Sequence, residues 1–352
     1  KANRKNWLKT DYIVILSLFY YTIHLIYLHD TESIRSSYML LFPYIYYVFF
    51  RHLRVNRKLN NNDINFLYSI MLIALLVEGG LFLTMYFFKV SPFAEPVEIY
   101  GKTTEYILLE IFQPVGAMGP VEAGFFFLLF SIFNLYVYNF TRNNMAIYIH
   151  LLFLVFLLAT LSRLPIILGL LLSFLMWLKG LVKYKDIVLF FILFLFLPSI
   201  VVSFFSDLFM NLKLRLLRTS IEVEASNRII LSPLIEFLFK NHKNFLFGAG
   251  YQLYRTLPYG YAIHNLFLAQ LADFGIIGLL LLIGLFYTII SEIKTCRSSY
   301  LYQLVFYSVI LWIINGSVQY AAYSFHYYTF IFFIFNLLML QHNLLSELNL
   351  RR

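Results

Sequence analysis

The chain has 352 residues, of which 61% are hydrophobic and only 13% are charged, with a formal net charge of +9. Soluble domains contain roughly 45–50% apolar and about 25% charged residues, so this composition excludes a soluble enzyme and a disordered chain. The single cysteine, Cys296, excludes a disulfide scaffold. The composition therefore predicts an all-α polytopic membrane protein.

A transmembrane helix needs about 20 mostly apolar residues, and this criterion predicts about ten spans, or about 10–12 if short segments are counted differently. The N-terminal apolar run lacks a small-residue cleavage site and is interpreted as an uncleaved first span. The predicted spans are residues 12–28, 34–50, 64–88, 121–140, 145–161, 164–179, 186–205, 264–290, 300–317 and 325–341. We predict that residues 1–352 form one integral membrane domain.

The Lys and Arg residues are distributed unevenly between the two sides of these spans. Sixteen of the 27 fall in segments on the side of the N-terminus, and four fall in the short segments on the other side. Cytoplasmic loops carry the excess of Lys and Arg, so both termini are expected in the cytoplasm. This distribution explains the net charge without a nucleic-acid partner.

Two external loops are predicted, at residues 89–120 and 206–263. The second loop holds the other seven cations, which are Lys213, Arg215, Arg218, Arg228, Lys240, Lys243 and Arg255. It also contains long apolar stretches, which indicate amphipathic helices lying on the outer membrane surface. The first loop is acidic and rich in proline.

Several motifs are absent from the sequence. It has no GxxxxGK[ST] motif, so we expect no ATPase, and no HExxH motif or Cys/His cluster with metal-ligand spacing, so we expect no zinc hydrolase. These absences permit a function without a metal or cofactor. The spans hold few ionisable residues, the deepest being His24, Glu78, His150 and Asp273, whereas a proton-coupled transporter usually has a denser relay. The polar chemistry is therefore expected at the external membrane face.

Arginines near that face are the first candidate site residues. Arg163 lies between two apolar runs in ATLSRLPIILG, where it either snorkels at a helix end or binds phosphate through its planar guanidinium. Arg228 precedes an apolar run and is a headgroup contact or a ligand-binding group. Arg215 and Arg218 share one helical face, which contacts solvent, headgroups or substrate.

The richest stretch runs from Phe247 to Phe286. Gly248 and Gly250 permit a tight turn, and His264 and Asn265 open the following span at a helix N-terminus, which favours anions. Asp273 lies nine residues deeper, about 13 Å along the helix axis, and must be paired, neutral or hydrated. The residues expected to bind diphosphate or sugar near this turn are Tyr254, Arg255, Tyr259, Tyr261 and Asn265.

Three segments together resemble the superfamily of O-antigen polymerases and O-antigen ligases. They are LSRLPIILGLL, NRIILSPLIEFLFKNHKNFLFGAGY and HNLFLAQLADFGIIGLLLLIGLF, within residues 145–290. The third segment, with His-Asn-x-x-Leu and an acidic residue before Gly-x-x-Gly, is the most specific. Two residues depart from the family pattern: Leu164 stands where Gly is frequent, and Asp273 stands where Glu is commoner.

The resemblance implies a glycosyltransferase C-like membrane fold and an inverting, metal-independent transfer of sugars from undecaprenyl diphosphate. On this basis Arg163, Arg228 and His264 are the expected catalytic residues, and Gly248, Gly250 and Asp273 the supporting ones. The implied location is the bacterial inner membrane, with the active site facing the periplasm. The implied partners are lipid-linked oligosaccharides, membrane lipid and a chain-length regulator protein.

Three functions are compared on this basis. An O-antigen polymerase is preferred because the sequence is rich in Phe, Tyr, Ile and Asn and the span count is low. An O-antigen ligase, which transfers the chain to lipid A–core, is the alternative enzyme. A flippase or other transporter of lipid-linked oligosaccharides is the alternative of another class, but the internal repeats common in transporters are not found in the sequence.

Overall fold

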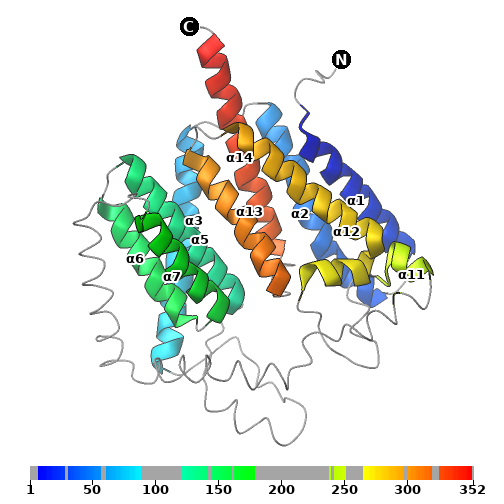
Figure 1. The fold of residues 1–352 in the computed structure, drawn as a ribbon, viewed down its shortest axis with the longest axis horizontal. Helices are drawn as coiled ribbons and strands as arrows, with labels where there is room; N and C mark the ends of the chain where they lie inside the picture. Colours follow the sequence, from blue (N-terminus) through cyan, green and yellow to red (C-terminus); the bar gives the residue numbers. More distant parts are fainter. Residues whose placement is uncertain are drawn as a thin grey trace, which may run out of the picture. The chain divides into compact units, whose positions relative to one another are not determined.

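The computed structural model describes residues 7–27, 31–56, 61–88, 120–141, 144–160, 162–178, 238, 242–250, 265–296, 300–318 and 325–350. These residues are almost entirely helical, and no β-strand occurs among them (Figure 1). The predicted all-α class is therefore confirmed for the described part of the chain.

Nine of the ten predicted spans coincide with helices, and the tenth, 186–205, lies outside the described residues. The helices are α1 (Lys9–Tyr27), α2 (Thr31–Val55), α3 (Asn61–Phe88), α5 (Pro120–Thr141), α6 (Asn144–Ala159), α7 (Arg163–Leu178), α12 (Leu266–Ile293), α13 (Tyr300–Val318) and α14 (Phe325–Leu350). Within the predicted external loops, the structure describes one further short helix, α11 (His242–Phe247). A 3₁₀ turn, η3 (Lys294–Cys296), follows α12.

Length and composition distinguish one of the described helices from the others. The helical stretch Leu266–Cys296 is long and apolar enough to cross a membrane, and six other described helices contain shorter apolar stretches of 10–17 residues. The number of transmembrane spans therefore stays a prediction.

The chain divides into two compact units. Unit 1 contains residues 1–64 and 226–352, and unit 2 contains residues 65–225. Unit 2 is thus inserted, along the sequence, between the second helix of unit 1 and the remainder of that unit.

Five long helices of unit 1 form a closed ring in the order α1, α2, α14, α13 and α12. Each helix packs against the next, and α12 packs against both α1 and the short α11 (Figure 1). The chain order and the spatial order therefore differ, because α14 lies beside α2 and α12 lies beside α1. Helices α1 and α2 therefore pack against helices from the last third of the chain.

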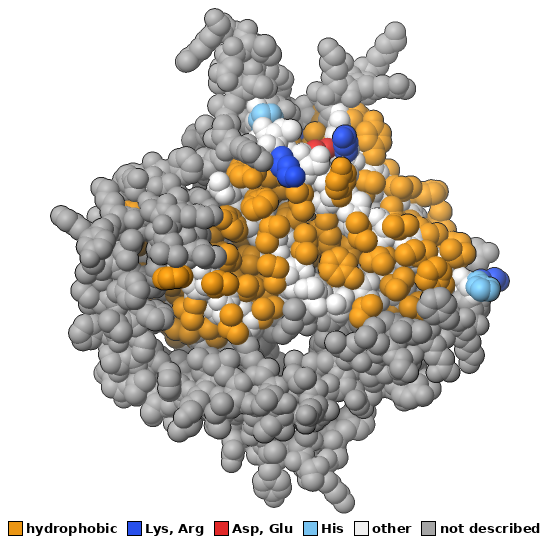
Figure 2. Space-filling model, in the orientation of Figure 1, with side chains coloured by type: hydrophobic (Ala, Val, Ile, Leu, Met, Phe, Trp, Pro, Cys, Tyr) orange, Lys and Arg blue, Asp and Glu red, His pale blue; other side chains and the backbone are white. Residues whose placement is uncertain are grey.

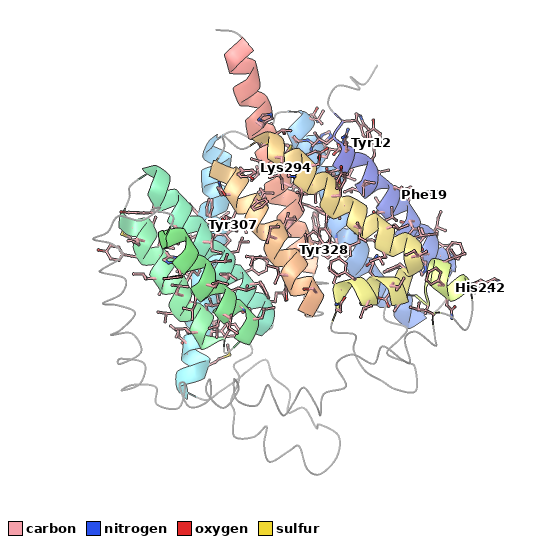
Figure 3. The ribbon with its side chains drawn as sticks, in the orientation of Figure 1. Tyr12, Phe19, His242, Lys294, Tyr307 and Tyr328 are labelled. Carbon is pink, nitrogen blue, oxygen red and sulfur yellow. The ribbon has the colours of Figure 1, made fainter. Side chains whose placement is uncertain are left out.

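An aromatic core joins these five helices. The ring centroid of Tyr21 lies 4.7 Å from that of Phe274 and 5.4 Å from that of Tyr44. The ring of Tyr328, labelled in Figure 3, lies 4.2 Å from Trp312 and 6.3 Å from Tyr44. All five side chains are buried. Tilted and edge-to-face pairs of this kind contribute about 0.5–1.5 kcal/mol each beyond their burial, so they fix how the helices face one another.

A buried ion pair fastens the start of α1 to the end of α2. Asp11 is fully buried and accepts hydrogen bonds from Arg54 Nη2 at 2.8 and 2.9 Å and from the Tyr47 hydroxyl at 2.7 Å. Arg51 Nε lies 3.1 Å from the same carboxylate, and the Arg51 guanidinium stacks over Trp7 at 3.9 Å. Because a buried carboxylate is tolerated only when it is paired, these contacts fix the register of the two helices.

The N-terminus of α1 is capped by a residue from the end of α12. The carboxylate of Glu292 accepts hydrogen bonds from the backbone N–H of Lys9 and from both the N–H and the hydroxyl of Thr10, the latter at 2.7 Å. The carboxylate of Asp11 accepts from the N–H of Leu8 at 2.9 Å. The first N–H groups of a helix lack internal partners and favour negative charge, so these two carboxylates stabilise the start of α1.

Helix α5 is the centre of unit 2 and packs against both α6 and α7. Its residues 123–135 are all buried. Helix α3 joins this core through Phe82, whose ring lies 6.1 Å from that of Phe127, and through Gly79. A Cβ atom on Gly79 would lie 2.1 Å from the ring of Phe156, so α3 can approach α6 this closely only through a glycine.

Candidate functional site at the break in helix α12

Helix α12 is broken at Gly275, whose φ is 64° and ψ is −167°. Such a backbone conformation is accessible to glycine but strained for other residues. We call residues 266–274 the first half of α12 and residues 276–293 the second half; Figure 1 shows the two halves running in different directions. The predicted span 264–290 thus coincides with a helix whose backbone ladder stops at Gly275, a break that the sequence does not indicate.

Backbone groups of the segment after α11 replace part of the ladder that is lost at the break. The N–H of Ala249 donates to the carbonyl oxygen of Ala272 at 2.9 Å, and the N–H of Gly250 donates to that of Asp273 at 2.9 Å. The last carbonyl groups of a helix lack internal partners and need them from elsewhere. Residues 248–250, which we call the Gly-x-Gly segment, therefore cap the first half of α12.

Glycine is required on both sides of this contact. Gly248 and Gly250 have φ values of 74° and 106°, in agreement with the predicted tight turn. A Cβ atom on Gly248 would lie 2.3 Å from the backbone carbon of Asp273, and one on Gly275 would lie 2.3 Å from the carbonyl oxygen of Leu246. The two backbones thus touch at a distance that any side chain would prevent.

Two side chains of α1 bind the same region. The Tyr20 hydroxyl donates to the carbonyl oxygen of Phe274 at 2.6 Å, and His24 Nε2 bonds the carbonyl oxygen of Phe247. A carbonyl oxygen only accepts, so His24 must carry its proton on Nε2 to make this bond. The His24 ring also lies 4.9 Å from the ring of Phe274. The two α1 residues are one turn apart and therefore share a face of the helix.

Polar side chains continue along the first half of α12. Gln270 is buried and donates through Nε2 to the Tyr21 hydroxyl at 2.6 Å and to the carbonyl oxygen of Gly278 at 3.4 Å. Asp273 is completely buried in the last turn before the break. Buried polar groups are costly unless they are hydrogen-bonded, so this concentration next to a helix break marks a specialised region of unit 1.

Asn265 caps the beginning of α12. Its side-chain oxygen accepts from the N–H groups of Phe267 and Leu268, both at 3.0 Å, and its Nδ2 donates to the carbonyl oxygen of Ser317 at 2.9 Å. The asparagine thus starts the helix and ties it to the end of α13. Its role in substrate binding stays a prediction.

Arg163 lies in unit 2, as the first residue of α7. The turn before it is ordered by Thr160, whose hydroxyl accepts from the N–H of Ser162 at 3.2 Å, and the carbonyl of Ser162 accepts from the N–H of Ile166 at 3.2 Å. A Cβ on Gly124 would lie 3.1 Å from Pro165, so α5 passes close to this turn. The predicted position of Arg163 at a helix start is confirmed.

The other predicted site residues lie outside the described part of the chain. They are His264, Arg228, Arg215, Arg218, Arg255, Tyr254, Tyr259 and Tyr261. The structure brings together Gly248, Gly250 and Asp273, and it places Asn265 at the start of the same half-helix.

The ionisable residues predicted to lie deepest in the spans are all buried. His24 and Asp273 belong to unit 1, and Glu78 and His150 belong to unit 2. The Nδ1 atom of His150 lies 2.6 Å from the hydroxyl of Ser131. Within the described ranges, no three His, Cys, Asp or Glu residues are grouped so that they could hold a metal ion.

Tyr20 and Gln270 carry no sequence signal that assigns them to this region, and Gly275 is marked only as the first glycine of the Gly-x-x-Gly pattern, not as a break in the helix. His24 was distinguished only as one of the few ionisable residues in the spans. The spacing of Tyr20 and His24 indicates a shared helical face, but the carbonyl groups that they bind are determined by tertiary structure. No local signal separates Gly275 from Gly278, which is three residues later in the same apolar run.

Comparison with known proteins does not assign a family. No protein-family model matches the chain, and no curated protein sequence matches it.

Proposed function

We propose that the chain is a multi-pass membrane protein of about ten spans. The exposed face of α1 supports this proposal, because it is apolar where a helix of a soluble protein is polar. The exposed side chains on this face are Tyr12, Ile15, Leu16, Phe19, Ile23 and Ile26. Figure 2 shows hydrophobic side chains over most of the described surface near α1 and α12. Apolar surface of this extent is typical of contact with lipid or with another protein.

The proposed orientation has both termini in the cytoplasm and the loop 206–263 on the external side. Arg51, Arg54 and Lys294 lie at the end of unit 1 where α1 begins and α12 ends. Figure 3 shows Lys294 and His242 at opposite ends of this unit. Cationic residues mark the cytoplasmic end of membrane helices, so His242 and the break in α12 belong to the external half.

We propose further that the protein is an O-antigen polymerase, which joins lipid-linked oligosaccharide repeat units into long polysaccharide. One observation carries this proposal. The backbone N–H of Gly250, in the second resembling segment, donates to the carbonyl oxygen of Asp273, in the third segment, which begins with His264 and Asn265. These are two of the three segments on which the resemblance rests. Their contact supports a shared site formed by the external loop and the first half of α12.

The proposed chemistry uses positive charge at the membrane surface. The leaving undecaprenyl diphosphate gains negative charge as the bond between the sugar and the phosphate breaks. Arg163 and Arg228 would stabilise that charge, an effect for which one lost group commonly costs on the order of 3 kcal/mol, or about a hundredfold in rate. His264 would position or deprotonate the acceptor hydroxyl, for about 10²–10⁴-fold. Attack from the opposite face inverts the anomeric carbon.

Three substitutions test this proposal. We expect Arg163→Ala, Arg228→Ala and His264→Ala each to abolish long polysaccharide while the protein still reaches the membrane. Tyr287→Phe, at an exposed position on α12, is the control and keeps full chain length. Full-length polysaccharide from all three alanine variants would refute the proposed site.

The gel ladder of lipopolysaccharide from a deletion strain separates polymerase from ligase. A polymerase deletion leaves single repeat units on the lipid A–core. A ligase deletion instead accumulates long chains on the carrier lipid. Long chains on the carrier lipid in the deletion strain would therefore refute the polymerase and support the ligase.

Transport of lipid-linked oligosaccharide is the second candidate function, and the break in α12 favours it. Discontinuous helices commonly form the substrate sites of transporters. Purified protein in liposomes separates this candidate from an enzyme. If lipid-linked repeat units move between leaflets and no longer product forms, the protein is a transporter. If longer product forms from repeat units on one leaflet, it is a transferase.

A further inference from the structure

Contacts at both ends of the first half of α12 help to set its direction, in addition to the bond of Gln270 to Tyr21 along its length. At its start, Asn265 bonds the carbonyl oxygen of Ser317 in α13. At its end, Gly275 interrupts the helix, so residues 276–293 do not determine the direction of residues 266–274 through a continuous hydrogen-bond ladder. The contacts at the break must therefore hold the end of this half-helix in place.

Helix α1 provides two of those contacts through side chains. Tyr20 bonds the last carbonyl group of the first half, at Phe274, and His24 bonds the last carbonyl group of α11, at Phe247. One face of α1 thus holds both backbones that meet at the break. The Gly-x-Gly segment and the first half of α12 also bind each other directly. The bonds from Tyr20 and His24 attach this pair of segments to α1.

Helix α1 is itself fixed at its other end. Asp11 is paired with Arg54 of α2, and the start of the helix is capped by Glu292 from the end of α12. Helix α1 therefore contacts α12 at two places, at the break and at the end of the second half. This arrangement makes α1 a rigid reference along which the first half of α12 is aligned.

We propose that Tyr20 and His24 are positioning residues that fix the direction of residues 266–274. The inference rests on the proposed function for its catalytic consequence, because His264 immediately precedes Asn265 in the chain. A shift of this half-helix by about 1 Å would displace a catalytic group at its start, and misplacement of that size can cost about a hundredfold in rate.

Amide hydrogen exchange of the full-length protein in lipid nanodiscs tests the positioning directly. We expect Tyr20→Phe and His24→Phe each to raise deuterium uptake in residues 266–274 roughly three- to tenfold in rate, because each removes one hydrogen-bond donor and keeps a ring. His24→Gln keeps an N–H donor and should retain most of the protection. Tyr287→Phe, which removes an exposed hydroxyl from the second half, is the matched control. Unchanged uptake in α13 and α14 shows that the variants are folded.

Polymerisation of purified lipid-linked repeat units supplies the second measurement. A positioning role lowers kcat by about tenfold or more in Tyr20→Phe and His24→Phe and leaves KM within about twofold, with partial recovery in His24→Gln. Unchanged uptake in residues 266–274 overturns the inference, as does raised uptake with an unchanged kcat. If the wild-type protein makes no polymer, the proposed polymerase is refuted. If the variants nevertheless show raised deuterium uptake in residues 266–274, the positioning of the half-helix remains supported.

Discussion

Single residues explain why the start of α1 is held so tightly. Asp11 is a carboxylate without exposed surface, and it is matched by two arginines from α2 that approach within 3.1 Å. The sequence showed the cationic ends of the first two spans, but it gave no indication that Asp11 would pair with residues about forty positions later. A pairing of this kind depends on how the helices rotate against each other, which hydrophobic patterns specify only weakly.

Replacement of this carboxylate should be costly. Asp11→Asn leaves Arg54 buried with an uncompensated charge, and we expect a loss of about 3–5 kcal/mol in the free energy of unfolding. Denaturant titration in detergent measures the loss. Lys294→Gln also changes the charge by one, but at an exposed residue, and should stay within about 0.5 kcal/mol of wild type. Equal stability of the two variants would contradict a structural role for the buried pair.

Helices are the scale at which the sequence was most informative. Runs of apolar residues predicted the positions of nine described helices, because length and hydropathy are properties of the local sequence. Helices α2 and α14 extend beyond their predicted spans, to Val55 and Leu350, since hydropathy marks only the apolar part of a helix. The break in α12 was not predicted, because it is created by the backbone of residues 246–250, which approaches from elsewhere in the chain.

Two glycines in α12 should respond oppositely to alanine. Gly275→Ala forces a side chain into a positive φ and against Leu246, and we expect it to destabilise the protein by at least about 2 kcal/mol. Gly284→Ala meets only Ile13 Cδ1, at an ordinary 3.6 Å, and should stabilise the helix by about 0.5–1 kcal/mol. Thermal unfolding of both variants in the same detergent measures the difference. A Gly275→Ala variant as stable as Gly284→Ala would show that the break is not fixed by the glycine.

For the whole molecule, charge and apolarity together predict an orientation in the membrane. The distribution of cations predicts which ends of the helices face the cytoplasm, and the apolar face of α1 is the surface that we propose to contact lipid. Neither property predicts the division into two units or the ring of five helices, because both depend on contacts between helices that are far apart in the sequence. The sequence predicted only two kinds of feature in the candidate site, the glycine turn and the helix starts, because both are recognisable from a few neighbouring residues.

Site-directed labelling tests the orientation. In a Cys296→Ala background, His242→Cys and Lys294→Cys place single thiols at opposite ends of unit 1, both at exposed positions (Figure 3). A membrane-impermeant maleimide added to intact spheroplasts should label His242→Cys and leave Lys294→Cys unlabelled until the membrane is opened. Labelling of both residues, or the reverse pattern, would contradict the proposed topology.

The cap that Glu292 provides for α1 has a consequence for biosynthesis. During synthesis, helix α1 meets its capping carboxylate only after some 282 further residues have been made. Until then α1 and α2 can associate through Asp11 and Arg54, while the whole of unit 2 is synthesised between them and their remaining partners. The hairpin of α1 and α2 must therefore persist without its other partners while unit 2 is translated, and the ring closes only after α12, α13 and α14 have been made.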